Sequence, residues 1–352
     1  EPYCPKNYDG SFKGPVTLRK SLGNSLNIPA VKALRTIGIP TFIDQATAMG
    51  ITTWKDPKNY GLSLSLGGGE VRMIDLVQAF SVLANQGVKT PLTPILRIED
   101  YRGKELKVVN IEERKQILAE LTANTRDKKE GDLERVMDRA PAYLTSHIMQ
   151  DNTARVESFG SRSELVIPDQ IVSAKTGTTN DLRDNWTVGF TPEYLVMTWV
   201  GNNDNQAMNS AVVSGVTGAA PIFNDIMSYI LGESESVWQE KPPDVVSATV
   251  CETGFPAQEG KGCLMQSNDM YWKSSEPSVA EFIRKETWID PKTGVPPAYG
   301  EQIEGLVLEE HTIVSDPVSE LYCLDCNRAV TEEGRVIYEQ RTVTHDYQLK
   351  EN

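Results

Sequence analysis

Three consecutive strand-like segments, at residues 171–178, 186–191 and 194–203, limit most strongly how this chain can fold. They are rich in Val, Thr, Trp and Tyr, which favour extended structure. The turns between them are short enough for neighbouring strands to pair antiparallel. The segments therefore predict an antiparallel sheet, around which the other elements are arranged.

Helices are predicted before this sheet. In residues 71–87, apolar side chains recur near a helical period that ends at a glycine. They are Val71, Ile74, Val77, Ala79 and Leu83. A capping-box pattern over residues 41–44 opens a second helix, which Gly50 closes, and residues 140–156 predict a third. We expect a mixed fold of the α/β (α+β) class, with helices flanking the sheet.

Turn and linker patterns divide the chain. The stretch PILRIEDYRGKELKVV, residues 94–109, is typical of a β-hairpin with Arg102 and Gly103 at its turn. The charged, proline-containing stretch ESESVWQEKPPD is typical of a linker. We predict one domain over residues 1–232, a linker over 233–244 and a small β-rich C-terminal extension over 245–352.

The charge of the chain excludes some classes of partner. Its 352 residues contain 49 acidic and 35 basic side chains, a net charge of -14. Broad attraction to nucleic acid phosphates is therefore not expected, and we predict no nucleic-acid partner. No apolar run approaches the roughly 18 residues of a membrane-spanning helix. The first residue is Glu1 rather than Met, so we expect the chain to be part of a longer translation product.

Four of the five cysteines fall in the last third of the chain: Cys251, Cys263, Cys323 and Cys326. Disulfides, free thiols and a zinc site are the alternatives. Only the pair at 323 and 326 has the spacing of a metal knuckle, because the other two cysteines lie too far apart for a second one. We predict no metal and no cofactor, and the state of these cysteines stays open.

The stretch VSAKTGTTNDLRDNWTVGF begins on the first of the three predicted strands. Lys175, Thr176 and Thr178 would present an ammonium and hydroxyls able to hold a substrate carboxylate. Gly177 would let a ligand backbone approach the strand edge, where main-chain N–H groups can face an oxyanion. The alternative is an ordinary exposed strand end with a Thr-Gly turn.

A second cluster, SLGNSLNIPAVKAL, occupies residues 21–34. Ser25 and Asn27 precede Pro29, which suits the first turn of a helix that continues through the alanines and valine beyond it. Helix capping by Asn27 or Ser25 is one interpretation. A capping loop is also a rigid place from which to present a hydroxyl and an amide to a substrate.

Together the two clusters resemble the S-x-N and K-T-G motifs of the penicillin-binding proteins, specifically the transpeptidase domain of the class A (bifunctional) members. The stretches SLNIPAVK and AKTGTTNDLRDNW carry the motifs, and the resemblance covers most of residues 1–232 in the family's order. Further matching stretches are NYDGSFKGPVTLRKSLGNS, SLGGGEVRMIDLVQAFSVLANQG, DNTAR and TPEYLVMTWVGNND. The resemblance implies a transpeptidase fold of the penicillin-binding and serine β-lactamase type, an antiparallel sheet flanked by helices.

The resemblance also implies an activity. A serine attacks the D-Ala-D-Ala amide of a peptidoglycan stem peptide, releases the last D-Ala and passes the acyl group to an amine, and penicillins acylate the same serine. By motif match, Ser25 would relay a proton beside the Lys175 ammonium, and Asn27 would bind the substrate amide. Lys175, Thr176 and Thr178 would bind the carboxylate, with the Thr178 N–H in the oxyanion hole. The implied location is the extracytoplasmic face of the bacterial cell membrane.

The family's S-x-x-K segment is missing, since no lysine has a serine three residues before it. The nearest form is Thr17-Leu-Arg-Lys20. We expect the nucleophile to precede Glu1, together with the family's N-terminal glycosyltransferase domain, so the upstream part of the same protein is a predicted partner. The alternatives are an inactive cell-wall-binding relative, or a D,D-carboxypeptidase or β-lactamase type of serine hydrolase.

Overall fold

The computed structural model describes residues 5–123, 129–179, 182–209, 217–251, 266–275, 283–294, 304–315, 321–323 and 328–330. The chain divides into two compact units. Unit 1 comprises Glu1–Ile39, Ser247–Tyr271 and Ser275–Asn352, and unit 2 comprises Pro40–Val246 and Trp272–Ser274. We describe each unit by itself, and the domain boundaries at 232 and 245 stay predictions.

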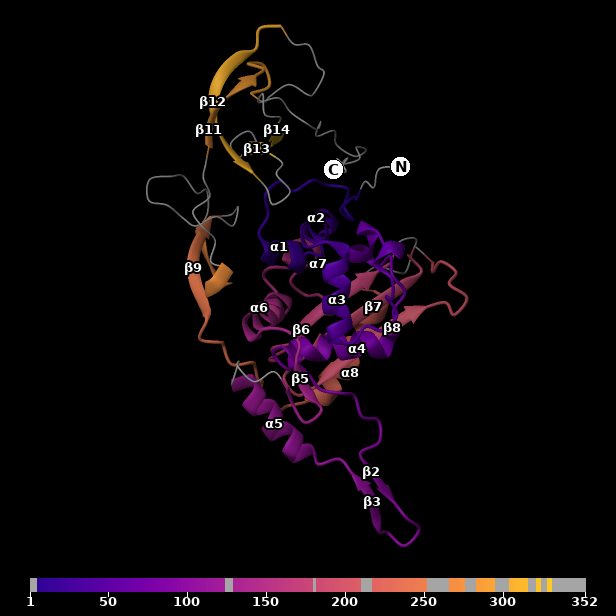
Figure 1. Ribbon diagram of the computed structural model, residues 1–352. Coiled ribbons are helices and arrows are strands. Elements are labelled where there is room, and N and C mark those ends of the chain that lie inside the picture. Colours follow the sequence, from indigo (N-terminus) through magenta and orange to yellow (C-terminus); the bar gives the residue numbers. More distant parts are fainter. Residues whose placement is uncertain are drawn as a thin grey trace. The chain divides into compact units, whose positions relative to one another are not determined.

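The centre of unit 2 is the predicted antiparallel sheet (Figure 1). Its strands are β6 (Ser173–Thr178), β7 (Asp184–Phe190) and β8 (Leu195–Gly201), in the order β6-β7-β8. The register pairs Lys175 with Val188, and Trp186 with Trp199. Within the described part of this sheet β6 is therefore an edge strand, with β7 on one side only.

Helices cover both faces of this sheet, as predicted. On one face α8 (Ala219–Leu231) packs Phe223 against Ala174 and Val196 in a buried apolar cluster. A Cβ on Gly189 of β7 would lie 2.4 Å from the Phe223 ring, so glycine is needed for this close approach. On the other face α6 (Arg139–Gln150) contacts β6 through Ser173, whose Oγ donates to the Ser146 carbonyl at 2.7 Å.

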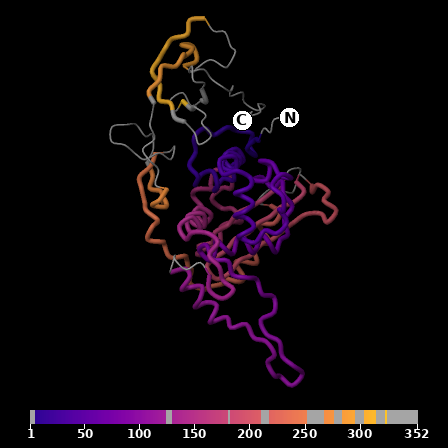
Figure 2. The backbone as a smooth tube through the Cα atoms, viewed as in Figure 1, coloured from indigo at the N-terminus to yellow at the C-terminus, as the bar shows by residue number. Residues whose placement is uncertain are grey.

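The remaining elements of unit 2 surround this core (Figure 2). The helical ones are α3 (Ile39–Met49), η1 (Pro57–Asn59), η2 (Leu62–Leu66), α4 (Met73–Ala84), α5 (Ile111–Ala123) and α7 (Val156–Phe159). A small sheet has the order β1-β5-β4, formed by Val88–Lys89, Leu133–Arg135 and Lys129–Glu130. The predicted hairpin is confirmed as β2 (Arg97–Glu99) and β3 (Glu105–Val108), with Gly103 at φ +77° in its turn.

Two helix predictions need correction. The helix predicted to open within residues 41–44 begins earlier, because α3 starts at Ile39, directly after Gly38, the C-cap of the preceding helix Asn27–Ile37. In α4, Ile74 was expected to lie near the core, but its side chain is 55% exposed. Val82 is fully buried instead, beside Leu83. Ile74 therefore lies off the buried face of α4, whose buried residues are Asp75, Gln78, Ala79, Val82 and Leu83.

Unit 1 contains α1 (Leu18–Gly23) and α2 (Asn27–Ile37), together with strands from the C-terminal part of the chain. These strands are β9 (Val245–Cys251), β10 (Gln266–Trp272), β11 (Ile283–Ile289), β12 (Val307–Ser315), β13 (Leu321–Cys323) and β14 (Arg328–Val330), with η4 (Lys273–Ser275) following β10. The sheets are β10-β9 and β11-β12-β13-β14. Arg19 of α1 forms an ion pair with Asp269 of β10, and Arg19 Nε donates to Asp269 Oδ1 at 2.9 Å.

Two of the cysteines have a defined state. Cys251 and Cys323 are disulfide-bonded, so the free-thiol and zinc alternatives do not apply to them. Cys4, Cys263 and Cys326 lie outside the described residues. Across the described ranges, no cluster of three or more His, Cys, Asp or Glu side chains could hold a metal ion. No helix in those ranges combines the length and the apolar character that crossing a membrane requires.

Candidate active site

The candidate carboxylate-binding residues lie together on β6 of unit 2. Along a strand, side chains alternate between the two faces of the sheet. Lys175 and Gly177 share a face with Ser173, toward α6, whereas Thr176 and Thr178 share a face with Ala174, toward α8. The predicted ligand set is therefore split between the two faces of the sheet.

Two cations bind main-chain carbonyls at the β6 edge. Arg155 Nη1 donates to the Ala174 carbonyl at 3.1 Å, and Lys175 Nζ donates to the Thr176 carbonyl at 2.7 Å. In an antiparallel ladder, every second residue directs both its N–H and its C=O to the same edge. The Thr178 N–H, two residues further on, is accordingly directed to the edge that carries these two cations.

The Lys175 ammonium is chemically unusual. Burial first, and then the nearby Arg155 charge, lower its pKa from 10.5 to about 8. Lys175 therefore stays largely protonated at neutral pH, but it can lose its proton one to two units above neutrality. A group with this pKa can bind an anion or transfer a proton.

The hydroxyl of Thr178 is held by a buried amide. Asn185 of β7 is fully buried; its Nδ2 donates to Thr178 Oγ1 at 3.0 Å, and its Oδ1 accepts from the Ala219 N–H at 2.7 Å. Thr176 is only 8% exposed. Gly177 is exposed, and a Cβ there would meet only Trp186 Cβ, at 3.6 Å. The strand end is thus anchored from the α8 side.

The turn after β6 is also ordered by side chains. Asp184 accepts hydrogen bonds from Thr179 Oγ1 at 3.2 Å and from Trp199 Nε1 at 2.8 Å. Gly67, which follows η2 in the left-handed region at φ +92°, approaches the same turn, since a Cβ there would lie 3.5 Å from Thr179 Cγ2. This contact brings the SLGGGE stretch to the end of β6, a proximity that the sequence did not predict.

In unit 1, Ser25 lies where α1 ends. The Ser25 N–H donates to the Leu22 carbonyl at 3.2 Å and the Leu26 N–H to the Ser21 carbonyl at 2.9 Å, which is the Schellman arrangement. Its third feature is a left-handed residue, and Ser25 has φ 56°. Glycine usually fills this position because a side chain there costs free energy. Ser25 is therefore a strained residue, and its strain supports a functional interpretation of the S-x-N segment.

Asn27 is the first residue of α2, but neither Asn27 nor Ser25 caps the helix, so the capping interpretation is wrong. The cap comes from Asn7, whose Oδ1 accepts from the main-chain N–H groups of Asn27 at 3.0 Å and Ile28 at 3.2 Å. Asn27 Nδ2 instead donates to the Lys6 carbonyl at 2.7 Å. Three hydrogen bonds therefore join residues 6 and 7 to the start of α2.

The order of these motifs along the chain matches a known family. The penicillin binding protein transpeptidase domain matches residues 3–228, which is more than half of the chain. The chain belongs to this transpeptidase family. The resemblance noted from the S-x-N and K-T-G stretches is thereby confirmed.

Individual relatives agree with this assignment. Penicillin-binding protein 1A of Pseudomonas aeruginosa is 29% identical over 277 residues, covering 70% of this chain and 33% of that protein. Penicillin-binding protein 1A of Neisseria gonorrhoeae is 30% identical over 247 residues, covering 70% of this chain and 28% of that protein. The transpeptidase-family chain thus spans about a third or less of these relatives' lengths.

Solved structures confirm the fold. The crystal structure of penicillin-binding protein 1A from Haemophilus influenzae matches 78% of this chain and 42% of that chain, with a TM-score of 0.65 and 23% identity. The PonA1 protein from Mycobacterium tuberculosis, in complex with penicillin V, matches 72% of this chain and 66% of that chain, with a TM-score of 0.52 and 18% identity. The predicted penicillin-binding transpeptidase fold, with helices flanking an antiparallel sheet, is therefore correct.

Two residues of this transpeptidase-family site received no role from the sequence. Arg155 lies in the DNTAR stretch and Asn185 in the DNW stretch, both of which carried the family resemblance. The signal that the sequence offered for each was its place in a stretch that resembled the family. Their partners, the carbonyl of Ala174 and the hydroxyl of Thr178, became evident only from the fold.

Proposed function

We propose that this chain supplies the substrate-binding part of a peptidoglycan D,D-transpeptidase, which recognises the D-Ala-D-Ala end of stem peptides and is acylated by penicillins. The observation that carries the proposal is Lys175, a half-buried ammonium with a pKa of about 8 at the edge of β6. An extended peptide can pair with such an edge while the cation binds its terminal carboxylate. The family and the penicillin V complex of the PonA1 protein support the same proposal.

Each residue of the two motifs has a proposed role. Lys175, with Thr176 and Thr178, binds the carboxylate, and Gly177 leaves room for the ligand beside the strand. The Thr178 N–H is one donor of the oxyanion hole, which stabilises the tetrahedral intermediate as it forms. In the S-x-N segment, Ser25 relays a proton and Asn27 binds the substrate amide. The serine that forms the acyl-enzyme lies in a part of the protein upstream of this chain.

The proposed partners follow from this chemistry. They are peptidoglycan stem peptides, β-lactam antibiotics and the upstream part of the same protein, which carries the nucleophile and a glycosyltransferase domain. The proposed location is the extracytoplasmic face of the bacterial cell membrane, where such stem peptides are cross-linked. The disulfides at Cys251 and Cys323 support this location, because disulfides persist in oxidising compartments.

The test is the intact mass after incubation with penicillin, measured on this chain and on a version extended upstream through an S-x-x-K segment. We expect a single penicilloyl adduct on the extended protein and none on the short chain. The Lys175→Ala variant of the extended protein should acylate more slowly by roughly two orders of magnitude, whereas Lys89→Ala, a lysine elsewhere in unit 2, should acylate normally. An extended protein that folds and takes up no penicillin would refute the proposal.

A further inference from the structure

Arg155 is buried in unit 2 at the base of the candidate site. Its side chain is 2% exposed. Its guanidinium donates through Nη1 to the Ala174 carbonyl at 3.1 Å and through Nη2 to the Met149 carbonyl. The first carbonyl belongs to the β6 edge, one residue before Lys175, and the second belongs to the last turn of α6. One planar group therefore joins the strand to the helix beneath it.

The contact with α6 is reinforced beside it. Ser173 Oγ donates to the Ser146 carbonyl, so the start of β6 is linked to α6 twice, directly at Ser173 and through Arg155 at Ala174. A cation also interacts favourably with the carbonyls at the C-terminus of a helix. Burial lowers the pKa of Arg155 to about 10, and Asp151 opposes that shift, so the side chain remains charged at neutral pH.

Within the described part of unit 2, the elements packed on β6 are β7, α6 and, through Ala174, α8. Their titratable groups are Asp184 of β7, Arg139, Tyr143 and His147 of α6, and the exposed Asp225 and Tyr229 of α8. Asp184 is bonded to Thr179 and Trp199, Arg139 to Gln86, and the Tyr143 and His147 rings pack against each other. The charge that acts on the Lys175 ammonium is that of Arg155.

We propose that Arg155 is a positioning residue for Lys175: by holding the Ala174 carbonyl and the end of α6 together, it fixes the strand edge from which the Lys175 ammonium meets a substrate carboxylate. This inference rests on the proposed function of Lys175. Arg155 is too deeply buried to touch the substrate itself. Its planar fork can reach two carbonyls at once, which a lysine, with a single point of donation, cannot reproduce in the same geometry.

The test measures Lys175 directly in this chain, without penicillin. The rate at which trace acetic anhydride labels Lys175 is followed against pH by mass spectrometry. We expect half-maximal reactivity near pH 8 in the native chain. In Arg155→Met the midpoint should rise by about half a unit or more, because a neighbouring positive charge and an ordered desolvated site are both lost. In Arg155→Lys, which keeps the charge, the pH midpoint should rise by less than half of its rise in Arg155→Met.

Arg139→Met is the matched control, because Arg139 is also a buried arginine of unit 2 and bonds to Gln86 instead of β6. It should leave the Lys175 midpoint at the native value. The inference is overturned if Arg155→Met folds and its Lys175 is labelled with the same pH midpoint as in Arg139→Met. If Arg155→Met does not fold, the hydrogen-exchange rate of the main-chain amides of residues 174–178 tests the inference instead. This rate should be about tenfold faster in Arg155→Lys than in Arg139→Lys. Equal rates would overturn the inference.

Penicillin acylation of the upstream-extended protein separates the two proposals. A loss of acylation in Arg155→Met with an unchanged Lys175 midpoint would contradict the positioning role and leave the proposed function intact. A shifted midpoint in a chain whose extended form never reacts with penicillin would show that Arg155 controls Lys175 but that the proposed function is wrong. The acylation rate of Arg155→Met should also peak at a higher pH than that of the native extended protein.

Discussion

The Oδ1 of Asn185 accepts a 2.7 Å hydrogen bond from the Ala219 N–H, which makes a side chain of β7 the cap for the first turn of α8. The other end of the same amide donates to Thr178 Oγ1. Gly218 lies directly against it, since a Cβ there would be 2.6 Å from Asn185 Oδ1. The amide thus couples the anchoring of α8 to the end of the candidate substrate-binding strand.

Replacing Asn185 with Leu, which has a similar size, should destabilise the protein by about 1–3 kcal/mol, because the buried Ala219 N–H and the half-buried Thr178 hydroxyl lose their partner. Urea unfolding followed by tryptophan fluorescence measures this change. Asn202→Leu, at an exposed asparagine after β8, is the control and should change stability by less than about 0.5 kcal/mol. Equal stability of the two variants would show that the Asn185 contacts contribute nothing net.

Ser25→Gly separates the serine hydroxyl from the backbone at this position. Glycine adopts φ 56° without a side-chain penalty, so the variant should be as stable as the native chain or more stable by up to about 1 kcal/mol. If the hydroxyl relays a proton, acylation of the upstream-extended protein should nevertheless fall by roughly two orders of magnitude. Ser25→Ala, which keeps the strain, should lose the same activity and gain no stability. Full acylation by Ser25→Gly would exclude the relay.

The pKa of Lys175 predicts two opposite pH dependences. With a pKa of about 8, the ammonium form falls from about nine-tenths at pH 7 to about a tenth at pH 9, so carboxylate binding should weaken across that range. Stability should change in the other direction. The folded pKa lies below the unfolded value of 10.5, so between about pH 8 and 10.5 the unfolded chain binds more protons and stability rises with pH.

Urea midpoints of the native chain and of Lys175→Met, compared from pH 7 to 10.5, measure the stability effect. The difference in urea midpoint between the native chain and Lys175→Met should narrow as pH rises through 8, because only the native chain then loses the buried positive charge of Lys175. A pH-independent difference for Lys175→Met would mean that Lys175 titrates at the ordinary value of a lysine.

The parts of the fold that the sequence predicted depend on local patterns, and the parts that it missed depend on distant contacts. Strand-favouring residues and short turns were sufficient to predict the sheet that carries Lys175. The cap on α2 was missed because Asn7 lies twenty positions before Asn27 in the chain. The helix predicted over residues 140–156 was too long, because α6 ends at Gln150, where Asp151 Oδ1 accepts from the Thr153 and Ala154 N–H groups in an Asx turn.

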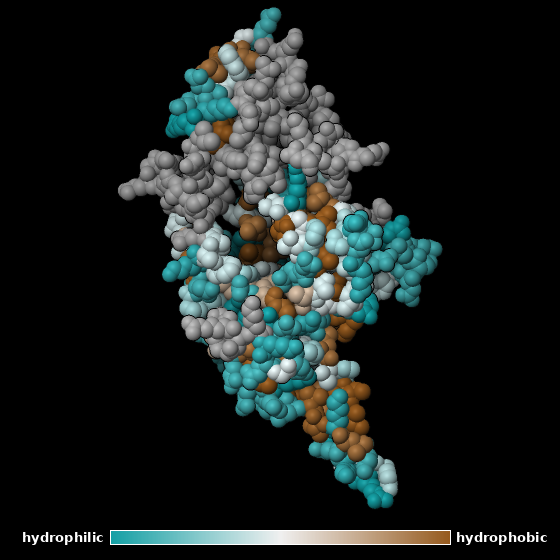
Figure 3. All heavy atoms as spheres, viewed as in Figure 1, coloured by the Kyte–Doolittle hydropathy of each residue, from teal (hydrophilic) through white to brown (hydrophobic). Residues whose placement is uncertain are grey.

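Exposed apolar residues show a second limit of pattern reasoning. The pattern in residues 94–109 correctly predicted a hairpin, yet every residue of its strands is exposed, and Figure 3 shows brown surface along the hairpin. Ile98 is 40% exposed and Leu106 is 63% exposed.

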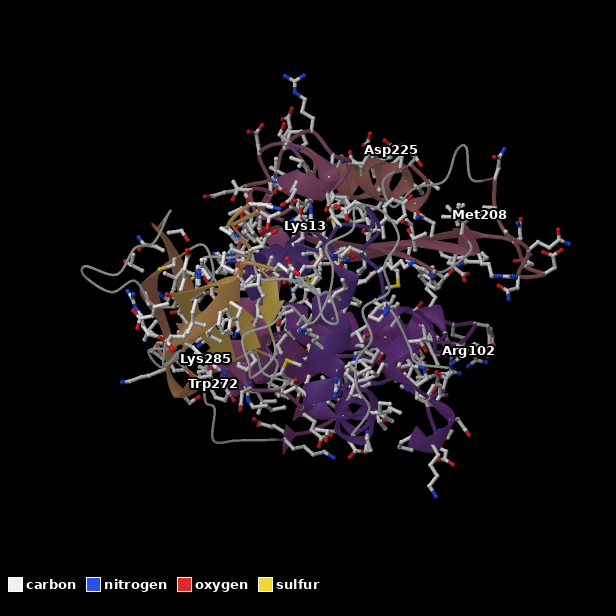
Figure 4. All side chains as sticks on the ribbon, turned by 90° about the horizontal axis from the view of Figure 1, so that it is seen from above. Lys13, Arg102, Met208, Asp225, Trp272 and Lys285 are labelled. Carbon is white, nitrogen blue, oxygen red and sulfur yellow. The ribbon has the colours of Figure 1, made fainter. Side chains whose placement is uncertain are left out.

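The predicted linker is part of unit 2. Gln239 of this linker is buried and donates to the Leu83 carbonyl at 2.9 Å. Asp244, at its end, accepts from Trp272, labelled in Figure 4, at 2.9 Å.

The ion pair between Arg19 and Asp269 makes a prediction about the C-terminal strands of unit 1. Both side chains are largely buried, at 16% and 13% exposure, and the pair joins α1, which leads into the S-x-N segment, to β10. Arg19→Met should cost about 1–3 kcal/mol, because it leaves a carboxylate partly buried without this partner. Asp269→Asn should cost a similar amount. The double variant should cost less than the sum, with a coupling energy of about 1–2 kcal/mol.

Tyr271 reports on the same pair. Its pKa is raised by burial first and then by the Asp269 charge, while Arg19 opposes the shift. Ultraviolet titration of the phenol should therefore show a higher pKa in Arg19→Met and a lower one in Asp269→Asn than in the native chain. Arg284→Met, which breaks an exposed ion pair with Glu310 in the same unit, should change neither the free energy of unfolding nor the pKa of the Tyr271 phenol. If the stability costs of Arg19→Met and Asp269→Asn are additive and the pKa of Tyr271 does not change, then α1 and β10 are not coupled through this ion pair.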